Sequence, residues 1–347
     1  MENNIKKLIL SVLFGLFIAI LTYSSILSYP IFCTENDFIL NISDHSSASI
    51  VGENLEDNIC IDSRLFKLAI YITFNQKNIK PGLYSMKGIR SVRDLLKLIT
   101  SISKNRISLT IYEGWNINDI ANSLERILHI DKNKFIDLCF NKSFIKSIGI
   151  DYDIPSLEGF LFPDTYVMLS TYSEKDVIRI LTRRFMDIYN NNINMESIAN
   201  NLSVTEIITL ASIIQGEAMV KDEMPLISSV YHYRMMISKE LEADPTILYY
   251  MTNEDLLTFK KSPGTKESSK VFRKYKNIDN PYNTYKNKGL PLGPINNPGL
   301  ESLKAASNPT HINKKYLYFV ADGTGRHIFS HTFKDHKKAI RKIKNGY

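Results

Sequence analysis

The stretch ASIIQGEAMV, residues 211–220, ends an apolar helical pattern with a carboxylate. The pattern begins at Ser203, which has Glu206 three residues later, the spacing of a capping box at a helix N-terminus. Apolar residues then recur at intervals of three and four, as on one face of a helix: Ile207, Leu210, Ala211 and Ile214. Glu217 continues this row. The sequence therefore predicts a helix that carries a carboxylate on its apolar face.

Glu217 has two interpretations. In apolar surroundings the charged form of a carboxylate is disfavoured, so its pKa rises and the group can act as a general acid near neutral pH. On this view Gly216, which costs about 1 kcal/mol of helix stability relative to alanine, lets a ligand approach the backbone. The alternative is that Glu217 lies in a fraying last turn and pairs with Lys221 at i,i+4. Spacing alone favours this alternative, so other segments must decide.

Two segments rich in aromatic and polar residues favour the catalytic interpretation, LEGFLFPDTY (157–166) and PYNTY (281–285), and the ADPT segment (243–246) adds two polar candidates. Such groups suit a sugar-polymer groove, because pyranose rings have apolar C–H faces and a rim of hydroxyls. The candidate substrate-binding residues, one of them on the helix itself, are Glu158, Asp164, Tyr166, Gln215, Asp244, Thr246, Tyr282, Asn283, Thr284 and Tyr285.

Structural roles are sufficient to explain the other titratable residues that could take part in chemistry. Asp244 also fits a turn or N-cap residue. The sequence predicts structural roles for His232, His327 and His331. It contains no nearby Ser/His/Asp order, HExxH motif or phosphate-binding loop. We therefore predict neither a metal site nor a cofactor.

Length, charge and cysteine content narrow the class of protein. With 347 residues, 44% hydrophobic and 11% aromatic, the chain can bury at least one full core and is not a disordered tail. A net charge of +7, from 43 basic and 36 acidic residues, is too mild for a nucleic-acid surface but suits an anionic polymer or a membrane face. Cys33, Cys60 and Cys139 support neither a zinc site nor a disulfide framework, and a single Cys60–Cys139 bridge stays open.

The N-terminus predicts a membrane anchor. Residues 8–27 are an uncharged run of 20 residues, long enough to cross a bilayer at about 1.5 Å per residue; we place the transmembrane helix at 8–29. Two lysines precede it and two acidic residues follow, so the positive-inside rule puts residues 1–7 in the cytoplasm and the chain after Pro30 outside. A cleaved signal peptide is the alternative, but the run exceeds the usual signal core and no A-x-A site follows.

Beyond the anchor the chain is predicted to be α+β. Residues 30–59 are polar, which indicates a linker. Residues 60–152 predict a small α+β module, and residues 153–347 a mixed α+β catalytic domain. The Lys-, Pro-, Gly- and Asn-rich run at 260–297 is too long for a plain connection and predicts a binding loop.

Residue patterns also predict individual elements. Strands are expected at 64–74, 80–86 and 106–114, and a closing hairpin at 315–333. Helices are expected at 91–102, 116–128, 173–189, 203–219 and 224–241.

Ordered matches to one family run through the chain. They include IYEGWNINDIANSL (111–124), LASIIQGEA (210–218), PYNTYKNKGLPLGPINNPGLESLKAASNP (281–309) and YLYFVADGTGRHIFSHTFKDH (316–336), besides LEGFLFPDTY and ADPT. In these stretches the chain resembles the MltG/YceG-like family of endolytic murein transglycosylases, from the anchor to the last hairpin.

The resemblance implies a single-pass enzyme of the bacterial inner membrane, with a cytoplasmic N-terminus, a LysM-like membrane-proximal module and a periplasmic catalytic domain. Such enzymes need no cofactor. They cleave the MurNAc–GlcNAc β-1,4 bond of nascent glycan strands without water, leave 1,6-anhydroMurNAc ends and terminate strand elongation. Peptidoglycan synthases in the membrane are the expected protein partners.

Position 215 departs from the family, whose members often read ASIVEKE, with glutamate where this chain has Gln215. At about 100° per residue, Gln215 lies roughly 200° around the helix from Glu217. Because Glu217 continues the apolar row, it is the predicted catalytic residue. Two alternatives stay open: a non-catalytic glycan-binding scaffold of the cell-wall machinery, and a hydrolase with Glu158 or Asp164 as its second carboxylate.

Overall fold

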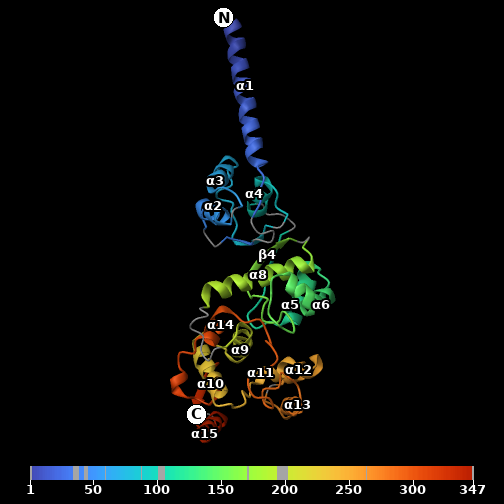
Figure 1. The fold of residues 1–347 in the computed structure, drawn as a ribbon, viewed down its shortest axis with the longest axis vertical. Helices are drawn as coiled ribbons and strands as arrows, with labels where there is room; N and C mark the ends of the chain where they lie inside the picture. The colour runs from blue at the N-terminus through green and yellow to red at the C-terminus, as the bar shows by residue number, and fades with distance from the viewer. Residues whose placement is uncertain are drawn as a thin grey trace. The chain divides into compact units, whose positions relative to one another are not determined.

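The structure is a computed structural model of the chain. It describes residues 2–33, 39–42, 46–58, 60–86, 88–100, 106–169, 172–193, 202–262 and 264–345. The chain divides into two compact units, the first of residues 1–110 with 165–172 and the second of residues 111–164 with 173–347. Each unit contains helices and strands, which confirms the α+β class. Figure 1 labels most of the helices and strand β4.

The first element, α1 (Glu2–Leu27), carries the apolar N-terminal run. Its segment Ile5–Leu27 has a mean hydropathy of 2.2 over its most apolar window, and no residue of that window is buried inside the protein. It is the one helix in the described part of the chain that is long and apolar enough to cross a membrane.

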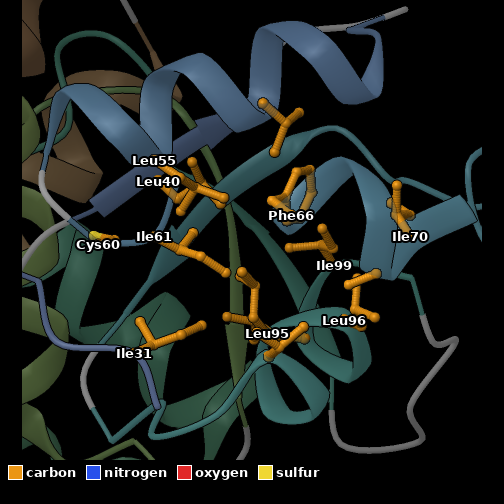
Figure 2. Packing of buried hydrophobic residues seen from close by; sticks show 14 of the residues in the cluster. Ile31, Leu40, Leu55, Cys60, Ile61, Phe66, Ile70, Leu95, Leu96 and Ile99 are labelled. Atoms are coloured by element: carbon orange, nitrogen blue, oxygen red, sulfur yellow. The ribbon is translucent and has the colours of Figure 1, made fainter. Parts of the chain in front are cut away.

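After α1, the described residues of the first unit form two small sheets and three helices. Its elements are β1 (Ile39–Ile42), α2 (Ala48–Asp57), α3 (Ser63–Ile72), β2 (Gly82–Ser85), α4 (Val92–Thr100), β3 (Arg106–Thr110) and β4 (Thr165–Leu169). The strands pair antiparallel, β1 with β2 and β3 with β4. Figure 2 shows the core, in which Leu40, Leu55, Phe66, Leu95 and Ile99 converge with almost no exposed surface.

Two predictions for this unit are wrong. The expected strand at 64–74 is α3, because Oδ1 of Asp62 accepts the backbone N–H groups of Arg64 and Leu65 at 2.8 and 3.2 Å and so starts a helix. The expected linker at 30–59 contains β1 and α2. The polar face of α2 resembles a loop in sequence, but Val51 and Leu55 on its other face are buried.

The second unit holds the other elements. They are α5 (Ile117–Leu128), α6 (Lys132–Phe140), α7 (Lys142–Ser147), α8 (Glu174–Asn192), α9 (Val204–Glu217), the 3-10 turn η3 (Lys221–Glu223), α10 (Met224–Met236), α11 (Asp244–Tyr249), α12 (Asn253–Lys261), α13 (Lys266–Lys276), α14 (Leu300–Ser307), the 3-10 turn η4 (Ile312–Lys314), β5 (Tyr318–Ala321), β6 (His327–Ser330) and α15 (Phe333–Lys344). In Figure 1, α9, α10 and α14 lie side by side, and they contact one another. β5 and β6 form the predicted C-terminal hairpin.

The second unit departs from the predicted organisation in two places. Helices α5 to α7, which we assigned to the membrane-proximal module of residues 60–152, pack within this unit instead. The expected binding loop at 260–297 contains α13, whose start is capped by Oγ1 of Thr265 accepting the N–H of Ser268 at 3.2 Å.

Cysteine pairing also differs from the bridge left open by the sequence. Cys33 forms a disulfide with Cys60, so the chain just after α1 is joined to the α2–α3 connection. Cys139 is a buried free thiol in α6 of the other unit, and burial raises its pKa well above the ordinary value. The Cys60–Cys139 bridge is therefore not formed.

We predict that reduction loosens the first unit alone. The bridged cysteines are 27 residues apart, for which loop-closure entropy gives about 3.5 kcal/mol of stabilisation. Hydrogen exchange of the purified protein, read by mass spectrometry with and without reductant, should show faster exchange in α2 to α4 and unchanged exchange in α9 and α10. C139S should behave as wild type. Equal protection of α2 to α4 in both states would contradict the prediction.

Candidate active site

Helix α9 forms as its sequence predicts. Oγ of Ser203 accepts the N–H of Glu206 at 3.3 Å, and Oε2 of Glu206 accepts the N–H of Ser203 at 2.8 Å, which completes the capping box. Every residue from Ile207 to Ile214 is buried. The helix is enclosed along this stretch, and its last residue, Glu217, lies half-buried just beyond it.

Glu217 is held by a side chain from the next helix. Oη of Tyr231, in α10, donates a hydrogen bond to Oε1 of Glu217 at 2.8 Å. Lys221 pairs instead with Glu113, with 3.0 Å between Nζ and Oε1. The alternative in which Glu217 pairs with Lys221 in a solvated last turn is therefore wrong.

A cavity of about 500 Å³ opens beside Glu217. One wall is polar and comes from α10, α11 and the segments near them: Glu217, Tyr231, Arg234, Glu242, Asp244 and Tyr285. The other is mostly aromatic and comes from the C-terminal hairpin and α15: Tyr318, Phe319, His327, Phe333 and His336. An ionisable group thus faces a ring-lined hollow large enough for a sugar.

Burial governs the protonation of the polar wall. Burial, together with the nearby charge of Asp244, raises the pKa of Glu217 to about 8, while the hydrogen bond from Tyr231 and the charge of Arg234 act in the opposite direction. The pKa of Asp244 is also raised by burial, against the hydrogen bond that it accepts from the Tyr285 hydroxyl. At neutral pH Glu217 is mostly protonated, which is the form a general acid needs.

Gly216 makes room for protein rather than for a ligand. A Cβ at this position would lie 2.8 Å from Cβ and 3.0 Å from Cγ of Pro245, the second residue of α11. The missing side chain lets α11 approach the end of α9. Asp244 is thereby brought close enough to Glu217 to influence its charge.

Comparison of the chain with known proteins identifies its family. The profile of the YceG-like family matches residues 40–342. The chain belongs to the YceG-like family. It is 30% identical over 321 residues to the endolytic murein transglycosylase of Bacillus subtilis (strain 168), covering 87% of this chain and 84% of that protein.

Two further similar proteins are consistent with this family assignment. The endolytic murein transglycosylase of Streptococcus pneumoniae (strain R6) is 25% identical over 382 residues, which span 99% of this chain and 66% of that protein. The crystal structure of a YceG-like protein from Listeria monocytogenes superposes with a TM-score of 0.54 at 27% identity, covering 87% of this chain and 98% of that one.

Of the residues predicted to bind substrate in this YceG-like chain, the cavity brings together Asp244 and Tyr285 with Glu217. The Nζ of Lys276 lies 3.8 Å from the centre of the Tyr285 ring. Tyr285 is therefore fixed by two partners, a carboxylate on its hydroxyl and an ammonium on its face.

Four predicted residues lie in buried hydrogen bonds outside the cavity lining. The hydroxyls of Thr246 and Thr284 are 2.9 Å apart, and Oγ1 of Thr284 accepts the N–H of Ala243 at 3.0 Å. The Asn283 side chain donates to the carbonyl groups of Lys276 and Ile278 at 3.0 and 2.8 Å. Oε1 of Gln215 accepts the N–H of Gly299 and the hydroxyl of Ser302, each at 3.0 Å.

Glu158 contacts a different set of residues from Glu217. It is buried at the N-terminus of α5, where Oε1 accepts the N–H of Ile117 at 3.1 Å and the Asn297 amide at 3.0 Å. Oε2 accepts the Tyr249 hydroxyl at 3.4 Å, and the ring of Tyr282 packs 4.8 Å from that of Tyr249. Burial raises the pKa of Glu158 to about 8. Its contacts join three segments of the family motifs.

Asp164 and Tyr166 complete the set. Asp164 accepts Nε and NH2 of Arg184 at 2.9 and 2.8 Å. Tyr166 lies in β4 of the first unit and is fully buried. Neither Glu158 nor Asp164 is among the described residues that line the Glu217 cavity.

The sequence analysis missed most of the aromatic wall and the partner of Glu217. Tyr231 follows Glu217 by fourteen residues in a different helix, so helical spacing within α9 could not reveal it. The hairpin did show a high density of aromatic residues, and that was the available signal for Tyr318 and Phe319.

We predict that G216A damages the site. The added methyl group would overlap Pro245, whose ring cannot rotate away, so α11 must shift, at a cost of about 1–3 kcal/mol. Activity and urea stability should both fall. P245G removes both contacting atoms, and in a double-mutant cycle it should recover part of the loss. Purely additive effects would show that this close approach is not the cause.

We also predict a pH-dependent difference in stability between wild type and E217Q. Folded Glu217 titrates at about 8, whereas an unfolded glutamate titrates near 4.3. Between these values the native state binds more protons, so the free energy of unfolding of wild type falls as pH rises. E217Q lacks this contribution and should gain stability relative to wild type from pH 5 to 9. Parallel urea profiles would refute the raised pKa.

Proposed function

We propose that this chain is an endolytic murein transglycosylase in which Glu217 is the catalytic acid. The supporting observation is a half-buried glutamate, hydrogen-bonded to Tyr231 and mostly protonated at neutral pH, that faces a ring-lined cavity. Membership of the YceG-like family and the names of the curated relatives favour the same activity. The substrate is then a glycan strand of peptidoglycan.

The proposed reaction cleaves the MurNAc–GlcNAc β-1,4 bond without water. Glu217 donates its proton to the glycosidic oxygen as the C1–O4 bond breaks, and the N-acetyl group of the same sugar stabilises the positive charge at C1. The C6 hydroxyl then attacks C1 and loses its proton, which gives a 1,6-anhydroMurNAc end. In the simplest form Glu217, now ionised, accepts that proton, because no water has to be activated on the opposite face of the ring.

Substrate contacts are assigned to the two walls. Asp244 and Tyr285 offer a carboxyl group and an aromatic face beside Glu217, and we propose that they orient the N-acetylated sugar. Tyr318 and Phe319 add two aromatic rings to the cavity lining, and we propose that one of them contacts the C–H face of a pyranose ring. Thr246, Asn283 and Thr284 would support these segments from behind, through the buried hydrogen bonds described above.

The N-terminal part of the chain fits an anchoring role. We propose that α1 spans the inner membrane, with residues 1–7 in the cytoplasm and the chain after Pro30 outside. The Cys33–Cys60 disulfide supports this orientation, since such bonds persist in oxidising compartments. The first unit would serve as the LysM-like membrane-proximal module, and membrane placement would bring the site to strands leaving a peptidoglycan synthase.

We predict that E217Q lowers formation of anhydro ends by about 10²–10⁴-fold, the usual contribution of a general acid. Q215E, on the far side of the same helix, should keep most of the activity. In wild type kcat/KM should fall above pH 8, as Glu217 ionises. The assay incubates purified protein with uncrosslinked glycan strands and identifies the ends by mass spectrometry. Reducing ends, which carry one more water, would indicate a hydrolase; undiminished product from E217Q would exclude Glu217 as the acid.

A further inference from the structure

A second carboxylate makes two hydrogen-bonding contacts with a histidine that lines the same cavity. Nδ1 of His327, the first residue of β6, lies 2.9 Å from Oε2 of Glu223 in η3. Oε1 of Glu223 accepts the backbone N–H of His327 at 3.1 Å. Both side chains are only 7% exposed. The carboxylate thus holds the histidine at two points.

This arrangement fixes which imidazole nitrogen is free. An ionised Glu223 can only accept hydrogen bonds, so Nδ1 of neutral His327 carries the proton and Nε2 carries the lone pair. No described residue hydrogen-bonds Nε2, and His327 lines the cavity that contains Glu217. The ring of Phe319 packs edge-to-face against the imidazole at 5.3 Å. A basic nitrogen in a fixed orientation is therefore available to a bound sugar.

The Glu223–His327 pair is not the only link between the hairpin and η3 among the described residues. The adjacent Arg326 already joins the hairpin to η3 through Asp222, with 2.7 Å between NH2 and Oδ2. That ion pair is exposed, whereas the Glu223–His327 pair is enclosed. A carboxylate behind an imidazole stabilises the imidazolium that forms when the far nitrogen takes a proton.

We propose that His327, held by Glu223, is the base that accepts the C6 hydroxyl proton during ring closure. This inference rests on the proposed transglycosylase activity and divides its two proton transfers between two residues. The C1–O4 bond breaks as Glu217 gives its proton to O4. The C1–O6 bond forms as the O6 proton passes to Nε2. The imidazolium then returns a proton to the Glu217 carboxylate through solvent, so no proton is gained or lost overall.

Charges around the pair suit this role. Arg326 Nη1 lies 3.7 Å from Oε1 of Glu223. The other charged or titratable groups nearby are Asp322 on the hairpin, Asp222 on η3, and Glu217, Arg234, Glu242, Asp244 and His336 around the cavity. Most of them are carboxyl groups, which are negatively charged when ionised and then favour a transient imidazolium.

The test uses the full-length protein and uncrosslinked glycan strands, with anhydro ends as the readout. H327A and H327Q should both lose about 10²–10⁴-fold in rate, the usual contribution of a general base. Added imidazole should restore part of the H327A rate. Wild type should lose activity toward acid pH, because a charged imidazole cannot accept the proton; the residual activity of H327Q should lack this acid limb.

R326Q is the matched control, because it breaks the exposed tether of the same hairpin and leaves the imidazole in place. It should keep most of the wild-type rate. An H327Q variant with the wild-type rate and acid limb would overturn the inference, as would an H327A variant that imidazole does not rescue while R326Q is equally impaired. If wild type forms anhydro ends and E217Q does not, either of these two results excludes His327 as the base but leaves the proposed transglycosylase activity in place. If wild type forms no anhydro ends, the proposed function itself fails.

Discussion

The site depends on keeping one carboxyl group away from water. Glu217 ends a helix that is buried from Ile207 to Ile214, and Tyr231 covers one of its oxygens at 2.8 Å. Enclosure raises the pKa of Glu217 to about 8, while it raises that of Tyr231 well above its ordinary value, so the bond joins two neutral groups. A buried carboxyl group that must stay protonated weakens the fold at high pH. Its presence beside a cavity is therefore better explained by chemistry than by stability.

A series of close contacts maintains that enclosure. Gly216 admits Pro245, which sets Asp244 beside Glu217. At the other end of α11, Tyr249 reaches the buried Glu158. α11 is therefore fixed at both ends by residues of the family motifs, although it is only one and a half turns long and could not hold its position alone.

The sequence predicted those parts of the fold that are decided locally. Capping at Ser203 and the spacing of apolar residues were sufficient for α9, because both signals lie within one helix. The segment now called α3 was misread, since its aromatic and β-branched residues favour strands while the deciding cap, Asp62, precedes them. Local propensity is overruled wherever the buried face is chosen by distant partners, as for Phe66 in the core of the first unit.

The same distinction applies to the site. Residues such as Asn283 and Thr284 were chosen because amides and hydroxyls can bind sugars, but the same groups also satisfy backbone atoms in a buried loop. Sequence cannot separate these uses, because the residue types are identical and only the direction of the side chain differs. Asp244 and Tyr285 differ from them in facing the cavity.

The working parts are nonetheless concentrated in a short stretch of chain. Glu217 ends α9, Glu223 lies in the turn that follows, and Tyr231 lies in the next helix. These fifteen residues supply the acid, its hydrogen-bond donor and the anchor of the hairpin that lines the cavity. Because Glu223 lies in η3, between α9 and α10, a shift of one helix relative to the other would displace both the acid and the anchor. These local tethers explain how a hairpin with little buried surface of its own can be held beside the cavity.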